Sequence, residues 1–160
     1  MPHNRRGVGF VRNLIKGKIT ETIFQHMFAE SDFATVIPFG YESVTPSLAQ
    51  YQHLVETQDV LDEIRDMPDF ILVKPDQTEL VFVQVKYRRR KEQARVLAMA
   101  KAMQRRWQTG WLFLATPDDF YMAPCSVIVE SSGDIPPLLT RWIPKTVQHQ
   151  YLELLREFER

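Results

Sequence analysis

The sequence predicts a mixed α/β domain with a central mixed β-sheet flanked by helices. Three observations support this fold class. Strand-like and helix-like segments alternate along the chain, two neighbouring segments have the pattern of a β-hairpin, and 44% hydrophobic with 25% charged residues is a globular composition. A chain of 160 residues is the size of one domain. We therefore expect a single domain over residues 1–160.

The N-terminal part is expected to contain an arm, a helix, a strand and an insertion. Residues 1–15 combine glycines with scattered positive charges, which is typical of a flexible basic arm. Over 18–30 the apolar side chains recur at helical spacing, and Glu21 lies at the edge of their stripe. Residues 33–39 predict a short strand, and 44–66 predict a helical insertion.

Residues 69–87 carry the strongest local signal. Two β-rich runs, 70–74 and 80–86, flank the turn-forming string Pro-Asp-Gln-Thr and predict a hairpin. A turn centred near 76–77 places Asp69 opposite Gln84 or Val85, at the end far from the turn. Because side chains alternate along a strand, Gln84 and Lys86 share one face. The hairpin therefore gathers an acid, an amide and a lysine at one end.

The remaining elements are a helix, several strands and a final helix. A helix over 91–107 has an apolar side and an opposite basic side, and Gly110 follows it. Strands are expected at 111–116, at 121–122 and at 125–130. The C-terminal extension, residues 125–160, ends in an amphipathic helix at 145–158. Its expected apolar positions are Val147, Tyr151, Leu154, Leu155 and Phe158.

Charge is strongly segregated along the chain, although the formal net charge is zero. Residues 1–18 and 86–106 together sum to +13, and the remainder sums to −13. Such asymmetry is typical of proteins that bind nucleic acid. The alternative reading is a solvated basic face that has no ligand.

Cysteine content and hydropathy exclude several protein classes. A single cysteine, Cys125, excludes an internal disulfide and a cysteine-based zinc site. Apolar runs are too short to cross a membrane. We expect a cytoplasmic protein with no membrane partner and no small-molecule cofactor.

The acid–amide–lysine cluster also carries a family resemblance. Pro68-Asp69, followed after fourteen residues by Gln84-Val85-Lys86, resembles the P-D…(D/E)-x-K motif of the restriction-endonuclease-like nuclease superfamily. Residues 16–21, at the start of a helix that leads into a strand, resemble the N-terminal segment of archaeal Holliday-junction resolvases. The resemblance covers about residues 16–124. It implies a metal-dependent endodeoxyribonuclease that hydrolyses DNA phosphodiester bonds and works as a homodimer.

Phosphodiester hydrolysis explains why these residue types are needed. Mg²⁺ or Mn²⁺ prefers oxygen ligands and usually takes one or two carboxylates. Asp69 would be the direct ligand and Glu21 a second one, with the carbonyl oxygens of Gln84 and Val85 completing the shell. Lys86 would contact the scissile phosphate and the attacking water.

Gln84 departs from the family pattern, in which this position is usually Asp or Glu. An amide oxygen can bind a cation but brings no charge, so metal affinity should be lower. Glu42 is the candidate for a substitute acid. Two alternatives stay open: a catalytically inactive domain that binds DNA or assembles complexes, and a plain hairpin whose Asp69 and Lys86 form an exposed pair.

Basic residues flank this cluster in the sequence. We expect them to contact DNA phosphates on either side of the cut, which positions a protein without reading bases. Since no segment is typical of a base-reading module, we expect recognition of DNA structure more than sequence. The candidates are Lys16, Lys18, Arg88, Arg89, Arg90, Lys91 and Arg95.

Overall fold

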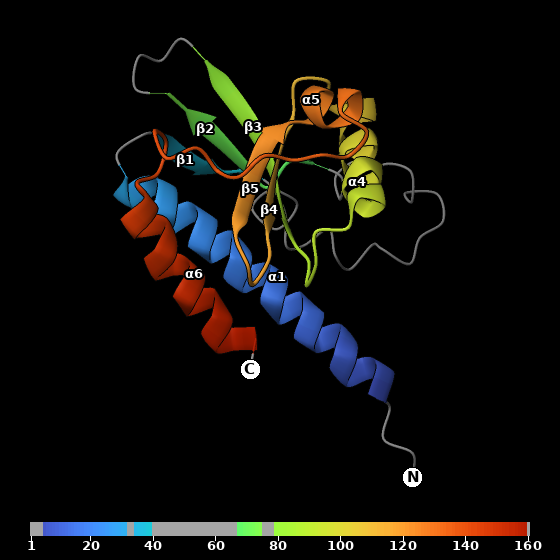
Figure 1. Cartoon of the computed structure of the whole chain (residues 1–160), viewed down its shortest axis with the longest axis vertical. Coiled ribbons are helices and arrows are strands. Elements are labelled where there is room, and N and C mark those ends of the chain that lie inside the picture. The colour runs from blue at the N-terminus through green and yellow to red at the C-terminus, as the bar shows by residue number, and fades with distance from the viewer. Residues whose placement is uncertain (1–4, 32–33, 40–66, 75–78, 160) are drawn as a thin grey trace.

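The structure, a computed structural model, describes residues 5–31, 34–39, 67–74 and 79–159. It is a mixed α/β fold with a five-stranded sheet flanked by helices, as the sequence predicts (Figure 1). The elements are α1 (Arg5–Glu30), β1 (Thr35–Pro38), β2 (Phe70–Val73), β3 (Leu80–Tyr87), α4 (Gln93–Arg106), β4 (Trp111–Ala115), β5 (Phe120–Pro124), α5 (Cys125–Glu130) and α6 (Lys145–Glu159). The expected insertion at 44–66 and the candidate Glu42 lie outside the described residues.

The sheet is mixed, with its strands in the order β1-β2-β3-β4-β5. Strands β3 and β4 are parallel and every other pair is antiparallel. A parallel pair needs a crossover connection, and α4 supplies it. The predicted hairpin is confirmed as β2 and β3, in a register that pairs Phe70 with Val83.

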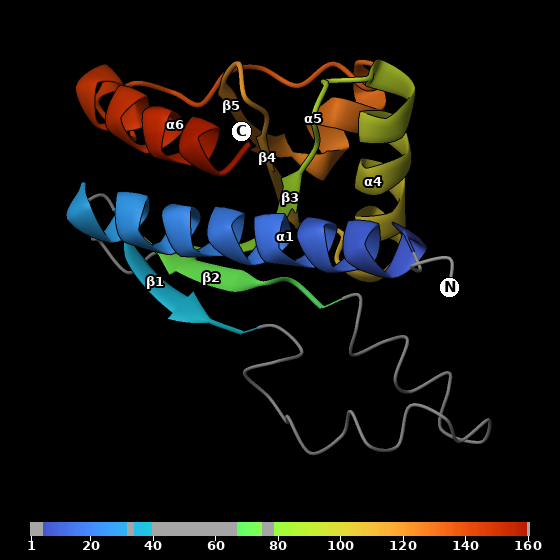
Figure 2. The ribbon, with the colours of Figure 1, turned by 90° about the horizontal axis from the view of Figure 1, so that it is seen from below.

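Each face of the sheet is covered by two helices. Helices α1 and α6 lie side by side over one face, where Phe24, Phe28, Phe113 and Val83 belong to the larger apolar core (Figures 1 and 2). Helices α4 and α5 cover the other face through a smaller core that includes Leu112, Leu114 and Ala100. The alternation predicted for β3 is confirmed, because Val81, Val83 and Val85 are buried against α1 while Gln84 and Lys86 are half-buried.

Helix α1 is much longer than the sequence predicts. It begins at Arg5 rather than at residue 18, so the expectation of an arm is wrong over residues 5–15. The glycines that suggested an arm lie inside the helix, where glycine is unfavourable but tolerated. Its second half matches the prediction, since Ile23, Phe24, Met27 and Phe28 are buried.

Residues 125–130 form helix α5, so the expectation of a strand there is wrong. The β-branched residues of this segment favour a strand locally. Pro124 instead ends β5 and stands at the N-cap of α5. Cys125 and Ile128, three residues apart, are then buried against the α4 side of the sheet, while Val127 is exposed. Tertiary packing thus outweighs the local preference.

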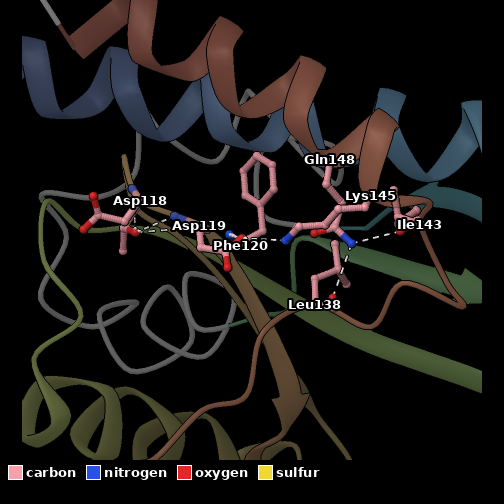
Figure 3. A network of polar contacts seen from close by, with 8 residues as sticks. Asp118, Asp119, Phe120, Leu138, Ile143, Lys145 and Gln148 are labelled. Carbon is pink, nitrogen blue, oxygen red and sulfur yellow. Dashed lines mark hydrogen bonds and ion pairs between the residues drawn. The ribbon is translucent and has the colours of Figure 1, made fainter.

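Helix α6 is held to the sheet by polar contacts at its N-terminal end (Figure 3). Gln148 is buried and donates hydrogen bonds from Nε2 to the carbonyl oxygens of Leu138 and Ile143. Lys145 forms an ion pair with Asp119, which also accepts a hydrogen bond from the N–H of Phe120. The predicted apolar face is confirmed in part, because Leu155 is buried and Val147 and Tyr151 pack against the larger core.

The buried residues of α6 are Gln148, Leu152 and Leu155. Leu154 and Phe158, which were expected to be buried, are 38% and 52% exposed. Within the described ranges, none of the helices is long and apolar enough to cross a membrane.

Candidate metal-binding and catalytic site

Asp69 is held rigidly at the start of β2 by three hydrogen bonds. Its N–H donates to the carbonyl oxygen of Val83 at 2.9 Å, and its own carbonyl oxygen accepts from the N–H of Phe39 at 3.0 Å. Its carboxylate Oδ2 accepts from the N–H of Val85 at 2.7 Å. The backbone bonds continue the β1–β2–β3 ladders, and the bond to Oδ2 orients the carboxylate towards β3.

The site lies where β3 extends beyond β2. The last residue pair between the two strands is Phe70 with Val83, and β3 continues to Tyr87. In the described part of the chain, Gln84–Tyr87 therefore pair only with β4. This open edge lets side chains from both faces of the sheet approach Asp69. Lys86, on the strand face that it shares with Gln84, and Glu21 of α1 both act on Asp69.

Glu21 and Asp69 form a carboxyl pair. The two side chains are close enough for each to shift the pKa of the other. Burial, followed by the negative charge of Asp69, raises the pKa of Glu21 to about 7. Burial also raises the pKa of Asp69, although the Val85 hydrogen bond and the charge of Lys86 oppose this rise. Ionisation of both groups is therefore unfavourable, because both are largely buried and the negative charge of Asp69 acts on Glu21.

Two lysines, Lys18 and Lys86, act on both carboxyl groups. The charge of Lys86 lowers the pKa of Glu21 and that of Asp69 against the effect of burial. Lys18 lowers the same two pKa values, and its Nζ lies 3.9 Å from Oε2 of Glu21. The structure therefore brings together Glu21, Asp69 and Lys86, three residues that the sequence singled out from separate segments.

The oxygen ligands available to a cation here are few. No three His, Cys, Asp or Glu side chains of the described residues form a group that could hold a metal. A metal would thus rely on Glu21, Asp69, a neutral oxygen from Gln84 or the Val85 carbonyl, and water. Mg²⁺ suits such a set, because it keeps several waters and needs only one or two carboxylates.

The predicted basic run begins at the end of β3. The N–H of Arg88 donates to the carbonyl oxygen of Ala115 at 3.0 Å, which fixes the start of the loop beside β4. Arg89 and Arg90 are exposed. Lys91 lies over the ring of Tyr121 at 4.7 Å, and Arg95 forms an ion pair with Glu92. The loop therefore offers exposed cations close to the open edge of the sheet.

Lys16 differs from the other candidate DNA contacts. Its Nζ lies 3.3 Å from Oε2 of Glu159 and 5.6 Å from the Tyr87 ring centroid, and its side chain is only 17% exposed. Sequence reasoning did not identify Glu159 or Tyr87 as neighbours. Such a contact has no local signal, because the two ion-pair partners are 143 residues apart.

Comparison of the chain with protein-family models, curated proteins and solved structures finds no match. Its function is therefore inferred from the arrangement of Glu21, Asp69 and Lys86 and from the cations around them.

Proposed function

We propose that this protein is a metal-dependent endodeoxyribonuclease with a restriction-endonuclease-like core. The observation that carries the proposal is the carboxyl pair of Glu21 and Asp69 beside Lys86, at the open edge of β3. Two acids from different elements and one lysine are the groups that hydrolysis of a phosphodiester needs around a divalent cation.

The burial of the carboxyl pair supports the fit of a metal. Because Glu21 and Asp69 are buried, their negative charges are poorly solvated. Burial therefore raises both pKa values, and a bound proton relieves the cost of the charge. Glu21 and Asp69 would hold Mg²⁺ or Mn²⁺ in place of that proton, and the ion would supply the compensating positive charge. When bound, the ion would polarise the phosphate and lower the pKa of the attacking water. Asp69 would be the better-oriented ligand because Val85 already holds one of its oxygens.

Lys86 would be the group that faces the phosphate. It lies on the same strand face as Gln84 and is close enough to both acids to affect their ionisation. Its ammonium would hold a nonbridging phosphate oxygen and stabilise the charge that develops during attack. Gln84 would offer its amide oxygen to the metal or to the attacking water.

The DNA partner is supported by the loop that follows β3. Exposed Arg89 and Arg90, with Lys91 beside them, would neutralise phosphates next to the cut. Phosphate contacts position a duplex but carry no base information. We therefore infer that DNA structure guides recognition more than sequence does.

A second candidate function is favoured by one residue. Gln84 removes a negative charge from the position where the motif usually has an acid, which weakens metal binding. A chain with this substitution could keep the fold and the basic loop and act as a DNA-binding or complex-assembly module without cleavage.

Incubation with branched, single-stranded and linear duplex DNA, each with Mg²⁺ or Mn²⁺, separates the two functions. We expect the protein to cut at least one of these substrates, and a chelator to stop the reaction. Asp69→Asn removes a ligand charge and Lys86→Ala removes the phosphate contact. Each change should lower the cleavage rate by about 100-fold or more.

Asp134→Asn and Lys101→Ala are the matched controls, because both side chains are exposed and distant from β3 in the chain. They should cut at the wild-type rate. Binding of DNA without cleavage in either metal would support the second candidate. Unchanged cleavage by both site variants would show that Asp69 and Lys86 are not the catalytic groups.

A further inference from the structure

Phe39, Phe82 and Trp107 form an aromatic cluster at the C-terminal end of α4. The ring centroids lie 5.2 Å apart for Phe82 and Trp107, and 5.9 Å apart in each of the other two pairs. Trp107 is the C-cap residue of α4 and also packs against the smaller core. Phe39 and Phe82 belong to neither core of the described residues. All three residues keep part of their surface exposed, so the packing of the described chain does not use the cluster fully.

The strand register places this aromatic cluster beside the candidate site. The N–H of Phe39 donates to the carbonyl oxygen of Asp69, so Phe39 continues the β1–β2 register and lies opposite Asp69. Phe82 lies on β3 two residues before Gln84, on the strand face that also carries Gln84 and Lys86. Two residues along a strand span about 7 Å. The rings are therefore neighbours of the residues that would hold a metal and a phosphate.

Positive charge lies farther along the same strand. Lys86 shares the face of Phe82, and the exposed Arg89 and Arg90 follow the end of β3. This part of the protein thus offers aromatic surface at one end and cations at the other. A nucleotide has the matching features, because its phosphate is negatively charged and its base has a flat π-face. An apolar protein segment could cover the rings but would supply no counter-charge to the cations.

We propose that the aromatic cluster stacks against an unpaired base of a single-stranded DNA segment, next to the phosphate that Lys86 contacts. The inference deepens the proposed function and rests on it for the identity of the polymer. It narrows the substrate class to DNA that has a single-stranded stretch at the cut. Every base has a π-face, so such stacking is tolerant of sequence and agrees with recognition of DNA structure.

Uninterrupted duplex DNA does not fit the aromatic cluster equally well. Inside a duplex each base is paired and stacked on its neighbours, and a base must be extruded before a protein side chain can cover its face. This extrusion costs a few kcal/mol, whereas a base in a single strand is already available. Stacking of one base on aromatic side chains contributes about 1–3 kcal/mol to binding. The cluster would therefore favour single strands, flaps and gaps over a continuous duplex.

Fluorescence anisotropy with two short single-stranded oligonucleotides tests the stacking directly. One carries normal bases and the other carries abasic sites, so both have the same number of phosphates. A chelating buffer keeps the DNA uncut during the measurement. The wild type should bind the base-bearing strand about tenfold more tightly than the abasic strand, because only the former can stack. Equal affinities for the two strands would overturn the proposal.

Variants of Phe82 assign this preference to the aromatic cluster. Phe82→Leu keeps an apolar side chain but lacks the π-face, so it should bind both strands with nearly equal affinity. Phe82→Tyr keeps the ring and should retain the tenfold preference. Phe158→Leu is the matched control, because Phe158 is an exposed aromatic residue of α6 outside the cluster, and it should also retain the preference. A misfolded fraction lowers the active concentration for both strands alike, so the ratio still reports on stacking. A Phe82→Leu variant that keeps the full preference would place the base elsewhere.

Tryptophan fluorescence gives a second readout at the same cluster. The base-bearing strand should quench Trp107, and Trp107→Phe should abolish the quenching while keeping a ring. Trp111 and Trp142 contact each other at the larger core and should contribute a constant background. Quenching that survives in Trp107→Phe would contradict the proposal.

These measurements separate the stacking from the proposed catalysis, because they need no cleavage. A tenfold base preference in a protein that cuts no DNA with Mg²⁺ or Mn²⁺ would support the aromatic cluster and refute the nuclease. Cleavage by a protein that binds both strands equally would support the nuclease and refute the stacking.

Discussion

Glu21 is the residue whose chemistry depends most on its surroundings. On a free helix its carboxyl would be ionised at neutral pH. Next to Asp69 and partly buried, its pKa rises to about 7. Between pH 4.5, the ordinary pKa of a glutamate, and about 7, the folded protein therefore keeps a proton that the unfolded chain has lost.

Glu21→Gln should stabilise the metal-free protein as pH rises. Below the unfolded pKa of 4.5 the wild-type acid is protonated in both states, so it contributes fully to stability. As pH rises through about 7, the folded protein must ionise the group beside Asp69 and loses that contribution. A glutamine amide still donates to Asp69 without this loss. The gain should be about 1 kcal/mol, discounted for solvent screening, or roughly 2–4 °C.

Thermal melts in a chelating buffer at about pH 5 and about pH 8 measure this effect. Mg²⁺ should raise the melting temperature of the wild type at the higher pH and have less effect on Glu21→Gln. If the variant melts below the wild type at the higher pH, the pKa of Glu21 is not raised in the folded protein.

Gln84→Glu should tighten metal binding. The change adds one carboxylate on the face of β3 that also presents Lys86. Isothermal titration with Mn²⁺ should show affinity raised by about tenfold or more, because cation affinity increases with ligand charge. Gln104→Glu, on α4, is the control. Equal affinities for wild type and Gln84→Glu would place the metal away from this strand.

At the scale of elements, strand β3 organises the site. Its first half pairs with β2 and fixes Asp69, while its second half, from Gln84 onwards, carries the amide and the lysine. Pairing with β4 then positions the loop of Arg88 through the Ala115 carbonyl. The extension of β3 beyond β2 is therefore what joins the acids to the basic loop.

Gly133, which follows α5, has a conformation that side chains rarely adopt. Its φ is +101°, and a Cβ there would lie 2.3 Å from the carbonyl oxygen of Gln93 and 3.0 Å from the Cβ of Leu97. Gly133→Ala should lower the free energy of unfolding by about 2–3 kcal/mol, since it combines backbone strain with a clash against α4.

Urea denaturation measures this loss of stability. Gly9→Ala is the control, because its effect on the free energy of unfolding should have the opposite sign. Gly9 is helical and a Cβ would meet nothing there, so alanine should be neutral or stabilising by up to about 1 kcal/mol. Equal destabilisation by both substitutions would contradict the structural distinction between the two glycines.

At the scale of the whole molecule, the zero net charge is the sum of a strongly basic part of the chain and a strongly acidic remainder. The segments that sum to +13 lie on α1 and on the loop and helix after β3, and the acids lie mostly elsewhere. Such segregation would let a polyanion contact the basic segments of a protein that is neutral overall.

The salt dependence of DNA binding should report on the basic loop. The double variant Arg89→Ala, Arg90→Ala removes two exposed cations, so the slope of log affinity against log salt should fall in magnitude by about 2. Lys101→Ala with Arg105→Ala, two exposed cations of α4, is the control of equal charge change. Fluorescence anisotropy at several salt concentrations measures both slopes, and equal losses would mean a diffuse attraction.

The sequence by itself determined the β2–β3 hairpin and the position of Asp69, Gln84 and Lys86 at one end of it. Turn residues and β-rich runs are local signals, so the register of β2 and β3 and the shared face of Gln84 and Lys86 were predictable. The helical spacing of Phe24 and Phe28 likewise predicted a buried face for the second half of α1. The nuclease chemistry inferred from these residues stays a prediction.

Only the tertiary structure decided what lies next to these elements. The carboxyl pair requires α1 to pack across the open edge of β3. The ion pair of Lys16 is formed with Glu159, near the other end of the chain. Residues 125–130 became helical, and Leu154 and Phe158 turned outwards, because α5 and α6 fit the surfaces left by the sheet. Local propensity differs by only about 1 kcal/mol between states, whereas burial of each large side chain contributes about 1.5–3 kcal/mol. Packing therefore wins wherever the two disagree.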